Sequence, residues 1–206
     1  MATWAVVPVK HFKVGKSRLA TVLSDRARAG LSVRLLKRTM DLLARSAVIH
    51  HTLVVSCDDS ALQLAREQGA FTVNDSSLAD LNGALQKATH VAVSLGATSL
   101  LVLPSDLPLL EENDLEILAG VNGSEPCVSL APDRHGTGTN ALFVCPPGLL
   151  RYQFGAGSLT AHQQQARSQG AKVSIHQLPR VEFDVDEPAD LHRLQSIMAE
   201  FRDEEI

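Results

Sequence analysis

The stretch Leu100–Leu110 reads LLVLPSDLPLL and places one charge, Asp106, after an apolar run and between two prolines. A carboxylate is costly to bury alone, because the loss of water penalises its ionised form until a partner or a metal compensates. In one interpretation the run is a buried strand and Asp106 is an ordinary residue of the turn that follows. In the other, Asp106 is a metal-binding or catalytic carboxylate at the carboxyl edge of a sheet.

Around this run, short apolar segments alternate with amphipathic ones along the chain. Strands are expected at Trp4–Val9, Thr52–Cys57, Leu100–Leu103, Cys127–Ala131, Ala141–Cys145 and Lys172–Leu178. Apolar residues recur every three to four positions in the segments between them. Helices are therefore expected at Asp25–Ser46, Ser60–Gln68, Leu81–Leu95, Glu112–Ala119, Ser158–Gln169 and Pro188–Phe201.

Strands that alternate with helices predict crossover connections, a mainly parallel sheet and helices on both of its faces. The closer spacing of the strands after residue 127 predicts that the sheet becomes mixed there. We therefore expect one three-layer α/β domain over residues 1–206. In such folds ligands bind at the carboxyl ends of the strands, which is where Asp106 stands.

Composition argues against several classes of protein. The net charge of −4 over 206 residues is not that of a general nucleic-acid binder. No apolar run reaches the roughly 18 residues of a membrane span, and the N-terminus lacks the features of a signal peptide. Cys57, Cys127 and Cys145 form no CxxC pair, so neither a disulfide framework nor a zinc site is expected. We expect a cytoplasmic protein that binds neither nucleic acid nor membranes.

A basic segment, PVKHFKVGKSRL at Pro8–Leu19, follows the first expected strand and carries four cations, Lys10, Lys13, Lys16 and Arg18. Its GKS resembles the end of a phosphate-binding P-loop, but Lys10 stands where the GxxxxGK[ST] motif needs glycine. A basic loop at the carboxyl end of a strand suits a nucleotide triphosphate. A solvated charged loop is the alternative.

A second, acidic segment at Phe183–Leu191 reads FDVDEPADL. Asp184 and Asp186 are two residues apart, so in an extended segment both point to the same side. Together with Asp106 they suit a hard divalent cation, which offsets their mutual repulsion. The alternative is that Asp186 or Glu187 caps the helix that follows.

Two segments combine glycines with hydroxyl side chains. In PDRHGTGTN, at Pro132–Asn140, glycines alternate with Thr137 and Thr139, so the backbone can come close to an anion while N–H groups and hydroxyls donate to it. A hairpin turn is the alternative. FGAGS, at Phe154–Ser158, leads into a helix, and Ser158 is expected to be its N-cap at an end that suits an anion.

The remaining reactive residue types form no further pattern. His135 and His162 lie in or near these loops, where a histidine is more often a surface or capping residue than a general base, so neither is given a chemical role. The chain also lacks a GxSxG nucleophile elbow. Covalent catalysis is therefore not expected.

Taken in order, VPVK…GKSRL, LPSDLPLL, PDRHGTGTN, FGAGS and FDVDEPADL resemble the guanylyltransferase family of coenzyme F-420 biosynthesis, from about residue 6 to residue 194. The pair GTGTN and FGAGS is the specific part. LPSDLPLL and DVDEPADL are shared with the wider nucleotidyltransferase superfamily, which includes the molybdenum-cofactor guanylyltransferases. The resemblance implies the nucleotide-diphospho-sugar transferase (GT-A-like) fold.

The resemblance also implies an activity: transfer of GMP from GTP to the phosphate of 2-phospho-L-lactate, phosphoenolpyruvate or 3-phosphoglycerate, with release of pyrophosphate. A downstream transferase would then take up the product. The residues it assigns are Asp106, Asp184 and Asp186 to one or two Mg²⁺ ions, Lys10, Lys16, Ser17 and Arg18 to the GTP phosphates, Asn82 to the nucleoside, and Thr137, Thr139, Gly155 and Ser158 to the acceptor. Asp106, Lys16 and Arg18 are the expected catalytic residues. Glu187, where the superfamily often has threonine, either joins the metal ligands or begins the helix.

Two other functions stay open at this point. One is another nucleotidyltransferase of the same fold, such as a molybdenum-cofactor guanylyltransferase. Those enzymes usually open with a glycine-rich LAxGxS-type loop, which VPVKHFKVGKSRL lacks. The other is a catalytically silent nucleotide-binding domain, which has no need for three carboxylates at strand ends.

Overall fold

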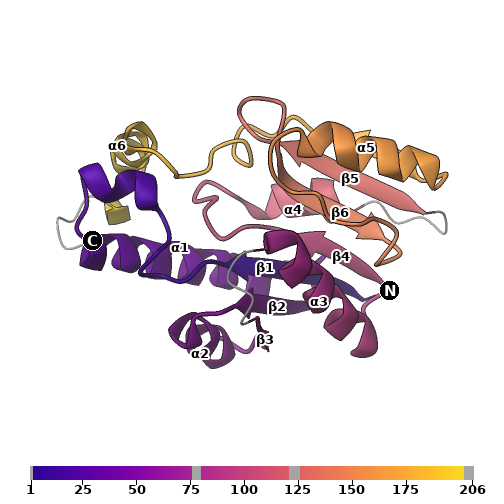
Figure 1. The fold of residues 1–206 in the computed structure, drawn as a ribbon, viewed down its shortest axis with the longest axis horizontal. Helices are drawn as coiled ribbons and strands as arrows, with labels where there is room; N and C mark the ends of the chain where they lie inside the picture. The colour runs from indigo at the N-terminus through magenta and orange to yellow at the C-terminus, as the bar shows by residue number, and fades with distance from the viewer. Residues whose placement is uncertain (1, 76–79, 121–125, 202–206) are drawn as a thin grey trace.

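The computed structural model describes residues 2–75, 80–120 and 126–201, and its core is a seven-stranded sheet in the order β3-β2-β1-β4-β6-β5-β7 (Figure 1). The strands are β1 Thr3–Val9, β2 His51–Ser56, β3 Phe71–Asn74, β4 Ser99–Val102, β5 Cys127–Pro132, β6 Thr139–Cys145 and β7 Lys172–Ile175. β1 pairs in parallel with β2 and β4, β2 pairs in parallel with β3, and β5 pairs in parallel with β7. Among the seven described strands, β6 alone runs against its neighbours, which are β4 and β5. The expected mainly parallel sheet that becomes mixed after residue 127 is confirmed.

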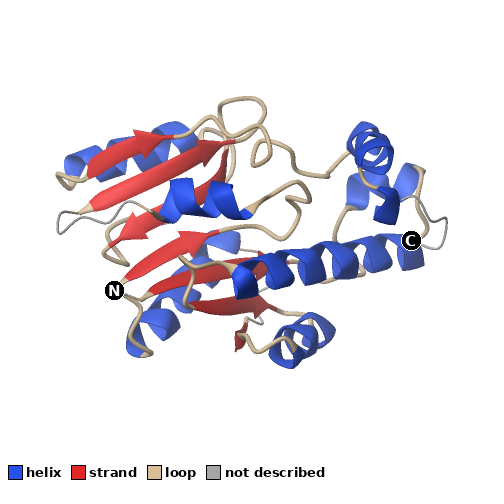
Figure 2. Cartoon of the chain, turned by 180° about the vertical axis from the view of Figure 1, so that it is seen from behind, coloured by secondary structure: helices blue, strands red, loops and turns tan. Residues whose placement is uncertain are grey.

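Helices cover both faces of the sheet. They are α1 Asp25–Arg45, α2 Asp59–Glu67, α3 Leu81–Ser94, α4 Glu112–Ala119, α5 Ser158–Ser168 and α6 Pro188–Ile197, with the 3₁₀ helices η1 Ser17–Thr21 and η2 Ala199–Phe201. Residues of α1, α2 and α4 pack on one face and residues of α3 and α5 on the other, as Figures 1 and 2 show from opposite sides. The three-layer α/β architecture is therefore confirmed. Within the described ranges, none of these helices combines the length and the apolar character that crossing a bilayer requires.

The core is divided by the alternation of side chains along each strand. In β1, Ala5 and Val7 face the α1 side, whereas Trp4 and Val6 face the α3 side. A third apolar cluster lies apart from these two and joins η1, the first half of α1, α6 and η2; its buried members are Leu19, Leu31, Leu35, Phe183, Val185, Leu191, Leu194 and Phe201. This cluster fixes η1 beside the acidic segment that leads into α6.

Several local expectations need correction. The strand β3 and the 3₁₀ helix η1 were not expected from the sequence. The strand expected to end at Leu178 ends at Ile175, because β7 is an edge strand whose partner β5 pairs only as far as Leu130. The helix expected to reach Phe201 ends at Ile197, because Met198 leaves helical geometry so that η2 can bury Phe201.

Candidate functional site

The basic loop after β1 is held in a fixed shape by buried contacts. The carbonyl of His11 accepts a hydrogen bond from the N–H of Gly15 (2.8 Å). Phe12, whose side chain is buried in the core, donates its N–H to Asp58 Oδ2 (2.7 Å), and Arg28 donates to the Gly15 carbonyl (3.0 Å). These bonds attach the loop to the end of β2 and to α1. The backbone that carries its cations is therefore held in place.

Lys16 is the point at which this loop turns toward the sheet. Its backbone has φ 56° and ψ 36°, the left-handed region, and no other non-glycine residue in the described ranges has a positive φ. Such backbone strain concentrates at functional sites. Here it directs the Lys16 Nζ to within 2.6 Å of Asp106 Oδ2, at the carboxyl end of β4. The expected catalytic lysine and carboxylate are thus in direct contact, although 90 residues separate them.

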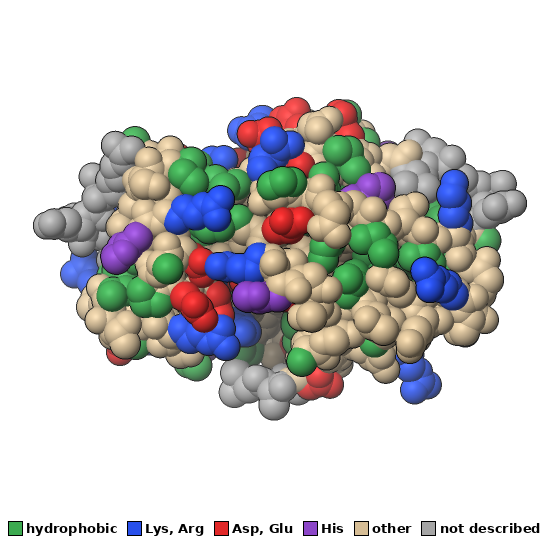
Figure 3. All heavy atoms as spheres, turned by 90° about the horizontal axis from the view of Figure 1, so that it is seen from above, with side chains coloured by type: hydrophobic (Ala, Val, Ile, Leu, Met, Phe, Trp, Pro, Cys, Tyr) green, Lys and Arg blue, Asp and Glu red, His purple; other side chains and the backbone are tan. Residues whose placement is uncertain are grey.

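The other two carboxylates of the expected metal site are also paired with cations. Arg18 donates to Asp186 Oδ2 (2.8 Å). Arg134, from the turn between β5 and β6, donates to the carbonyl of Asp184 (2.7 Å), lies 3.2 Å from its Oδ1, and binds the carboxylate of Asp190. Seen from above, acidic and basic side chains lie side by side on the half of the molecule that carries α6 (Figure 3). Sequence reasoning missed Arg134, whose only signal was a cation inside PDRHGTGTN.

The two acidic segments are neighbours in space. The N–H of Val185 donates to the carbonyl of Asp106 (3.1 Å), which places Asp184 and Asp186 on either side of a residue bonded to the β4 end. Even so, no three His, Cys, Asp or Glu side chains in the described part of the chain lie close enough together to form a metal-ligand group. In this structure, therefore, the three carboxylates are neutralised by Lys16, Arg18 and Arg134 rather than grouped around one point.

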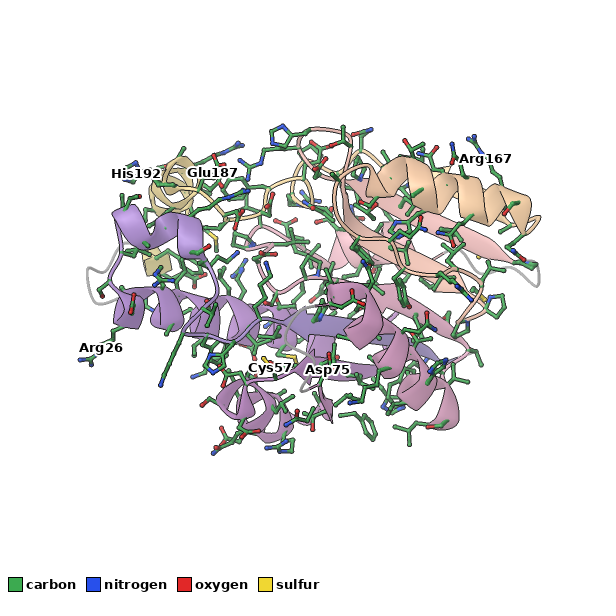
Figure 4. All side chains as sticks on the ribbon, in the orientation of Figure 1. Arg26, Cys57, Asp75, Arg167, Glu187 and His192 are labelled. Atoms are coloured by element: carbon green, nitrogen blue, oxygen red, sulfur yellow. The ribbon has the colours of Figure 1, made fainter. Side chains whose placement is uncertain are left out.

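Glu187 begins α6, as one of its two expected roles requires, and whether it also joins the metal ligands stays a prediction. It is the N-cap of that helix, and the labelled side chain in Figure 4 lies at the end of α6 nearest the loops from the sheet. Asp190 completes a capping box, since its Oδ2 accepts from the N–H groups of Asp186 (3.0 Å) and Glu187 (2.8 Å). Burial alone would raise the pKa of Asp190, but these bonds and Arg134 outweigh it and hold that pKa below its usual range.

The threonine-rich segment is a turn between antiparallel strands, as the hairpin alternative predicted, and it is tied to the start of α5. Asp133 Oδ1 accepts from the N–H of Thr137 (3.0 Å), and the Thr137 carbonyl accepts from the N–H of Leu159 (3.1 Å). These bonds bring Thr137 and Thr139, at the entry to β6, next to the FGAGS segment.

Ser158 differs from expectation. The N-cap of α5 is Gly157, with φ 74°, and Ser158 is the first residue inside the helix. The reason lies in the glycines: Gly155 (φ 130°) and Gly157 adopt backbone conformations that other residues rarely adopt, and they turn the chain into the helix one residue early. The Ser158 side chain is 1% exposed, and its Oγ has no hydrogen-bond partner among the described residues. An unpaired buried hydroxyl at a helix N-terminus suits an anionic ligand.

Asn82 holds the FGAGS segment from α3. Its Oδ1 accepts from the N–H of Phe154 (2.7 Å), and its Nδ2 donates to the Phe154 carbonyl (3.3 Å). Asn82 also lines a cavity of about 500 Å³ together with Gln86, His90 and Tyr152. The nucleoside contact expected of Asn82 stays a prediction.

Lys10 and Ser17, the other two residues expected to bind the triphosphate, are exposed on the same loop.

His162 is a buried residue of this region that sequence reasoning set aside. It is 0% exposed; its Nε2 accepts from the N–H of Gln153 (3.0 Å), and its Nδ1 lies 3.2 Å from Thr139 Oγ1. Burial lowers its pKa to about 4, so the ring is neutral near pH 7. The feature of the sequence that could have identified His162 was its position four residues after Ser158, which places both on the same, inward face of the helix.

This buried histidine predicts a pH dependence of stability. The unfolded state binds a proton on His162 below its ordinary pKa of 6.5, whereas the folded state does so only near pH 4. The free energy of unfolding should therefore be highest above pH 6.5 and fall by up to about 3 kcal/mol between pH 6.5 and pH 4. Urea unfolding at intervals of pH measures this. In His162→Asn the decline over the same range should be smaller, and an equal decline would contradict the assignment.

Comparison with known proteins shows the family to which the chain is similar. Residues 3–199 match the family described as guanylyl transferase CofC like. The chain is 43% identical to a phosphoenolpyruvate guanylyltransferase of Rubrobacter xylanophilus, over 95% of each chain. It is 30% identical to a 3-phospho-D-glycerate guanylyltransferase of Colwellia psychrerythraea, over 94% of this chain and 91% of that one. A 2-phospho-L-lactate guanylyltransferase of Methanothermobacter thermautotrophicus is 32% identical, over 93% of this chain and 83% of that one.

Solved structures share the fold at low identity. A Desulfovibrio desulfuricans G20 protein assigned to the nucleotide-diphospho-sugar transferases superposes with a TM-score of 0.72 at 14% identity, covering 98% of this chain and 99% of that one. A CMP:2-keto-3-deoxy-manno-octonic acid synthetase in complex with CTP superposes with a TM-score of 0.65 at 13% identity, covering 97% and 99%. The expected nucleotide-diphospho-sugar transferase fold is confirmed.

Proposed function

The chain belongs to the CofC-like guanylyl transferase family, and from this we propose that it transfers GMP from GTP to the phosphate of phosphoenolpyruvate, with release of pyrophosphate, in coenzyme F-420 biosynthesis. Phosphoenolpyruvate is chosen over the other two phospho-acids because the relative with 43% identity acts on it by name. The observation that carries the proposal is that Lys16 and Arg18 of the basic loop contact carboxylates of the two acidic segments. Lys16 contacts Asp106, after β4, and Arg18 contacts Asp186, before α6. The cytoplasmic location and the downstream transferase stay predictions.

The proposed reaction is an in-line displacement. An oxygen of the acceptor phosphate attacks the α-phosphorus of GTP, the bond from that phosphorus to the bridging oxygen breaks, and pyrophosphate leaves. A phosphate monoester is already ionised near neutral pH, so the attacking oxygen needs no general base. The protein has only to position two anions and neutralise the charge that develops.

The residues for these tasks lie on two sides of the site. Lys16 and Arg18 would bind the triphosphate, together with Lys10 and Ser17 of the same loop. Thr137, Thr139, Gly155 and Ser158 would hold the acceptor phosphate at the N-terminus of α5, where backbone N–H groups and the unpaired Ser158 hydroxyl can donate to it.

We also propose that Asp106, Asp184 and Asp186 hold Mg²⁺. Their oxygens are the ligands this ion prefers, and the Val185–Asp106 hydrogen bond keeps their segments together. Bound there, the ion supplies neutralisation of the phosphate charge. If Asp106 and Asp186 turned to a metal, their present partners Lys16 and Arg18 would be free to bind GTP.

Pyrophosphate release tests this proposal. The purified protein is given GTP and Mg²⁺ with phosphoenolpyruvate, 2-phospho-L-lactate or 3-phospho-D-glycerate, and ATP or CTP replaces GTP in parallel. We expect release with GTP and phosphoenolpyruvate, and little with ATP or CTP. Release with 2-phospho-L-lactate or 3-phospho-D-glycerate instead would support the guanylyltransferase reaction but show that the acceptor is not phosphoenolpyruvate. No release with any acid, even with a downstream transferase present to draw off the product, would overturn the guanylyltransferase proposal.

A further inference from the structure

His162 occupies a position between the two segments that would bind the acceptor. It lies one turn into α5 from Ser158, with no exposed surface. Its Nε2 faces the backbone N–H of Gln153, just before FGAGS, and its Nδ1 faces the hydroxyl of Thr139, at the start of β6. The ring also packs edge-on against Phe154, with ring centroids 5.0 Å apart.

These contacts determine where the imidazole proton lies. A backbone N–H can only donate, so the nitrogen that faces Gln153, Nε2, must accept and carries no proton. A neutral imidazole then has its proton on Nδ1, the nitrogen 3.2 Å from Thr139 Oγ1. The histidine therefore donates to the threonine oxygen.

The direction of that bond has a consequence for Thr139. A hydroxyl has one proton and rotates it toward whatever acceptor is available. Because the histidine already donates to Thr139 Oγ1, the threonine proton cannot point back at the ring and is directed elsewhere. Thr139 is 8% exposed and stands at the end of the turn tied to α5 through the Leu159–Thr137 hydrogen bond. The unpartnered Ser158 hydroxyl belongs to the same helix end.

We propose that His162 is a positioning residue that fixes the Thr139 hydroxyl as a hydrogen-bond donor to the acceptor phosphate. This inference rests on the proposed function, since it needs a phosphate bound beside Thr139. A donor fixed before the substrate arrives loses little on binding and cannot act as an acceptor that repels the anion. The same ring holds Gln153, while Asn82 holds Phe154, so the FGAGS segment is fixed from both sides.

Two amide variants separate the two hydrogen bonds of the ring. The amide of His162→Asn reaches the position of Nδ1 and can still donate to Thr139, but it leaves the Gln153 N–H without a partner. The amide of His162→Gln reaches the position of Nε2 and keeps the Gln153 bond, but it releases Thr139. Each variant loses one buried hydrogen bond. If the role of His162 were only structural, the two variants would therefore show similar changes in melting temperature and in kinetics.

We expect the KM for the acceptor to rise about 10-fold to 100-fold in His162→Gln and less than about 3-fold in His162→Asn, with the KM for GTP unchanged in both. Thr139→Val should raise the acceptor KM similarly, and adding His162→Gln to it should have no further effect. Equal acceptor KM values in the two histidine variants, additive effects in the double variant, or an equal rise in the KM for GTP would overturn the proposal.

A measurement without turnover separates this inference from the proposed function. Nitrogen-15 NMR of the histidine rings reports which nitrogen of His162 carries the proton, and we expect Nδ1. A proton on Nε2 would overturn the positioning role even in an active enzyme. Conversely, a proton on Nδ1 in a protein that releases no pyrophosphate with any phospho-acid would refute the function while the tautomer assignment stands.

Discussion

Replacement of Asp106 by asparagine should lower GTP-dependent pyrophosphate release by on the order of 10³-fold, about 4 kcal/mol in the barrier, while the protein stays folded. The change keeps the shape of the side chain and removes its charge. The variant would thus lose one of three proposed metal ligands and the partner of Lys16, which lies 2.6 Å away. The Asp106 side chain is 29% exposed, so the amide can be solvated and the fold tolerates it.

Two further measurements make this prediction specific. Glu116→Gln, the same loss of charge at an exposed position of α4, should leave turnover unchanged. Addition of Mg²⁺ with GTP should raise the melting temperature of the wild type and not that of Asp106→Asn, because the variant binds the pair more weakly. Turnover within about tenfold of wild type, or roughly 1.4 kcal/mol, would refute the metal assignment of Asp106.

The fold was predictable because its elements have strong internal patterns. The helical stripe in α1 and the apolar runs of β1 and β4 leave little choice of structure, and their order makes a parallel sheet the expected result. β3 was missed for a physical reason. Phe71–Asn74 has four residues of which only Val73 is buried, and it is a strand because the edge of β2 pairs with it. Phe71, Thr72 and Val73 are residue types that favour strands, but the segment is too short for a clear pattern, and its pairing is a property of the folded sheet.

The sequence was enough to predict which residues belong to the candidate site, but not which of them contact one another. Lys16, Arg18 and the three aspartates stand out by motif and position, but their pairing joins residues 90 and 168 positions apart. Arg134 and His162 act through such long-range contacts, so each looks like an ordinary loop or helix residue in the sequence. Ser158 shows the opposite error: its place before an amphipathic run is typical of an N-cap, and two glycines with positive φ moved the cap to Gly157.

The ion pairs also explain how three carboxylates can lie on adjoining segments of this fold. Asp106, Asp184 and Asp186 lie on two adjoining segments, and their mutual repulsion would separate these segments if nothing compensated it. Each carboxylate is contacted by one of three cations: Lys16 and Arg18 come from the basic loop, and Arg134 comes from the β5–β6 turn. The cations proposed to bind GTP therefore also hold these carboxylates in place, which links the stability of the site to its proposed use.

Lys16 is where this link can be measured, and its removal should be the second most damaging change. Loss of its ammonium should lower kcat/KM for GTP by about 10²-fold to 10³-fold, because one cation facing the triphosphate would be lost. Lys13→Ala removes the same charge from an exposed position of the same loop and should have little effect. A similar loss of activity in both variants would mean that the loop attracts GTP only by its overall charge.

The backbone of Lys16 gives a second, independent readout. At φ 56°, alanine carries the full cost of the left-handed conformation, whereas glycine adopts it freely. Lys16→Gly and Lys16→Ala lack the same ammonium, so they should be equally inactive, yet Lys16→Gly should be more stable by about 1 kcal/mol. Denaturant unfolding measures the difference. Equal stabilities would show that the loop relaxes out of the left-handed conformation, and an active Lys16→Gly would show that the conformation matters and the charge does not. The expected result, two inactive variants of unequal stability, would mean that the chain accepts a strained backbone at Lys16 in order to place its ammonium beside Asp106.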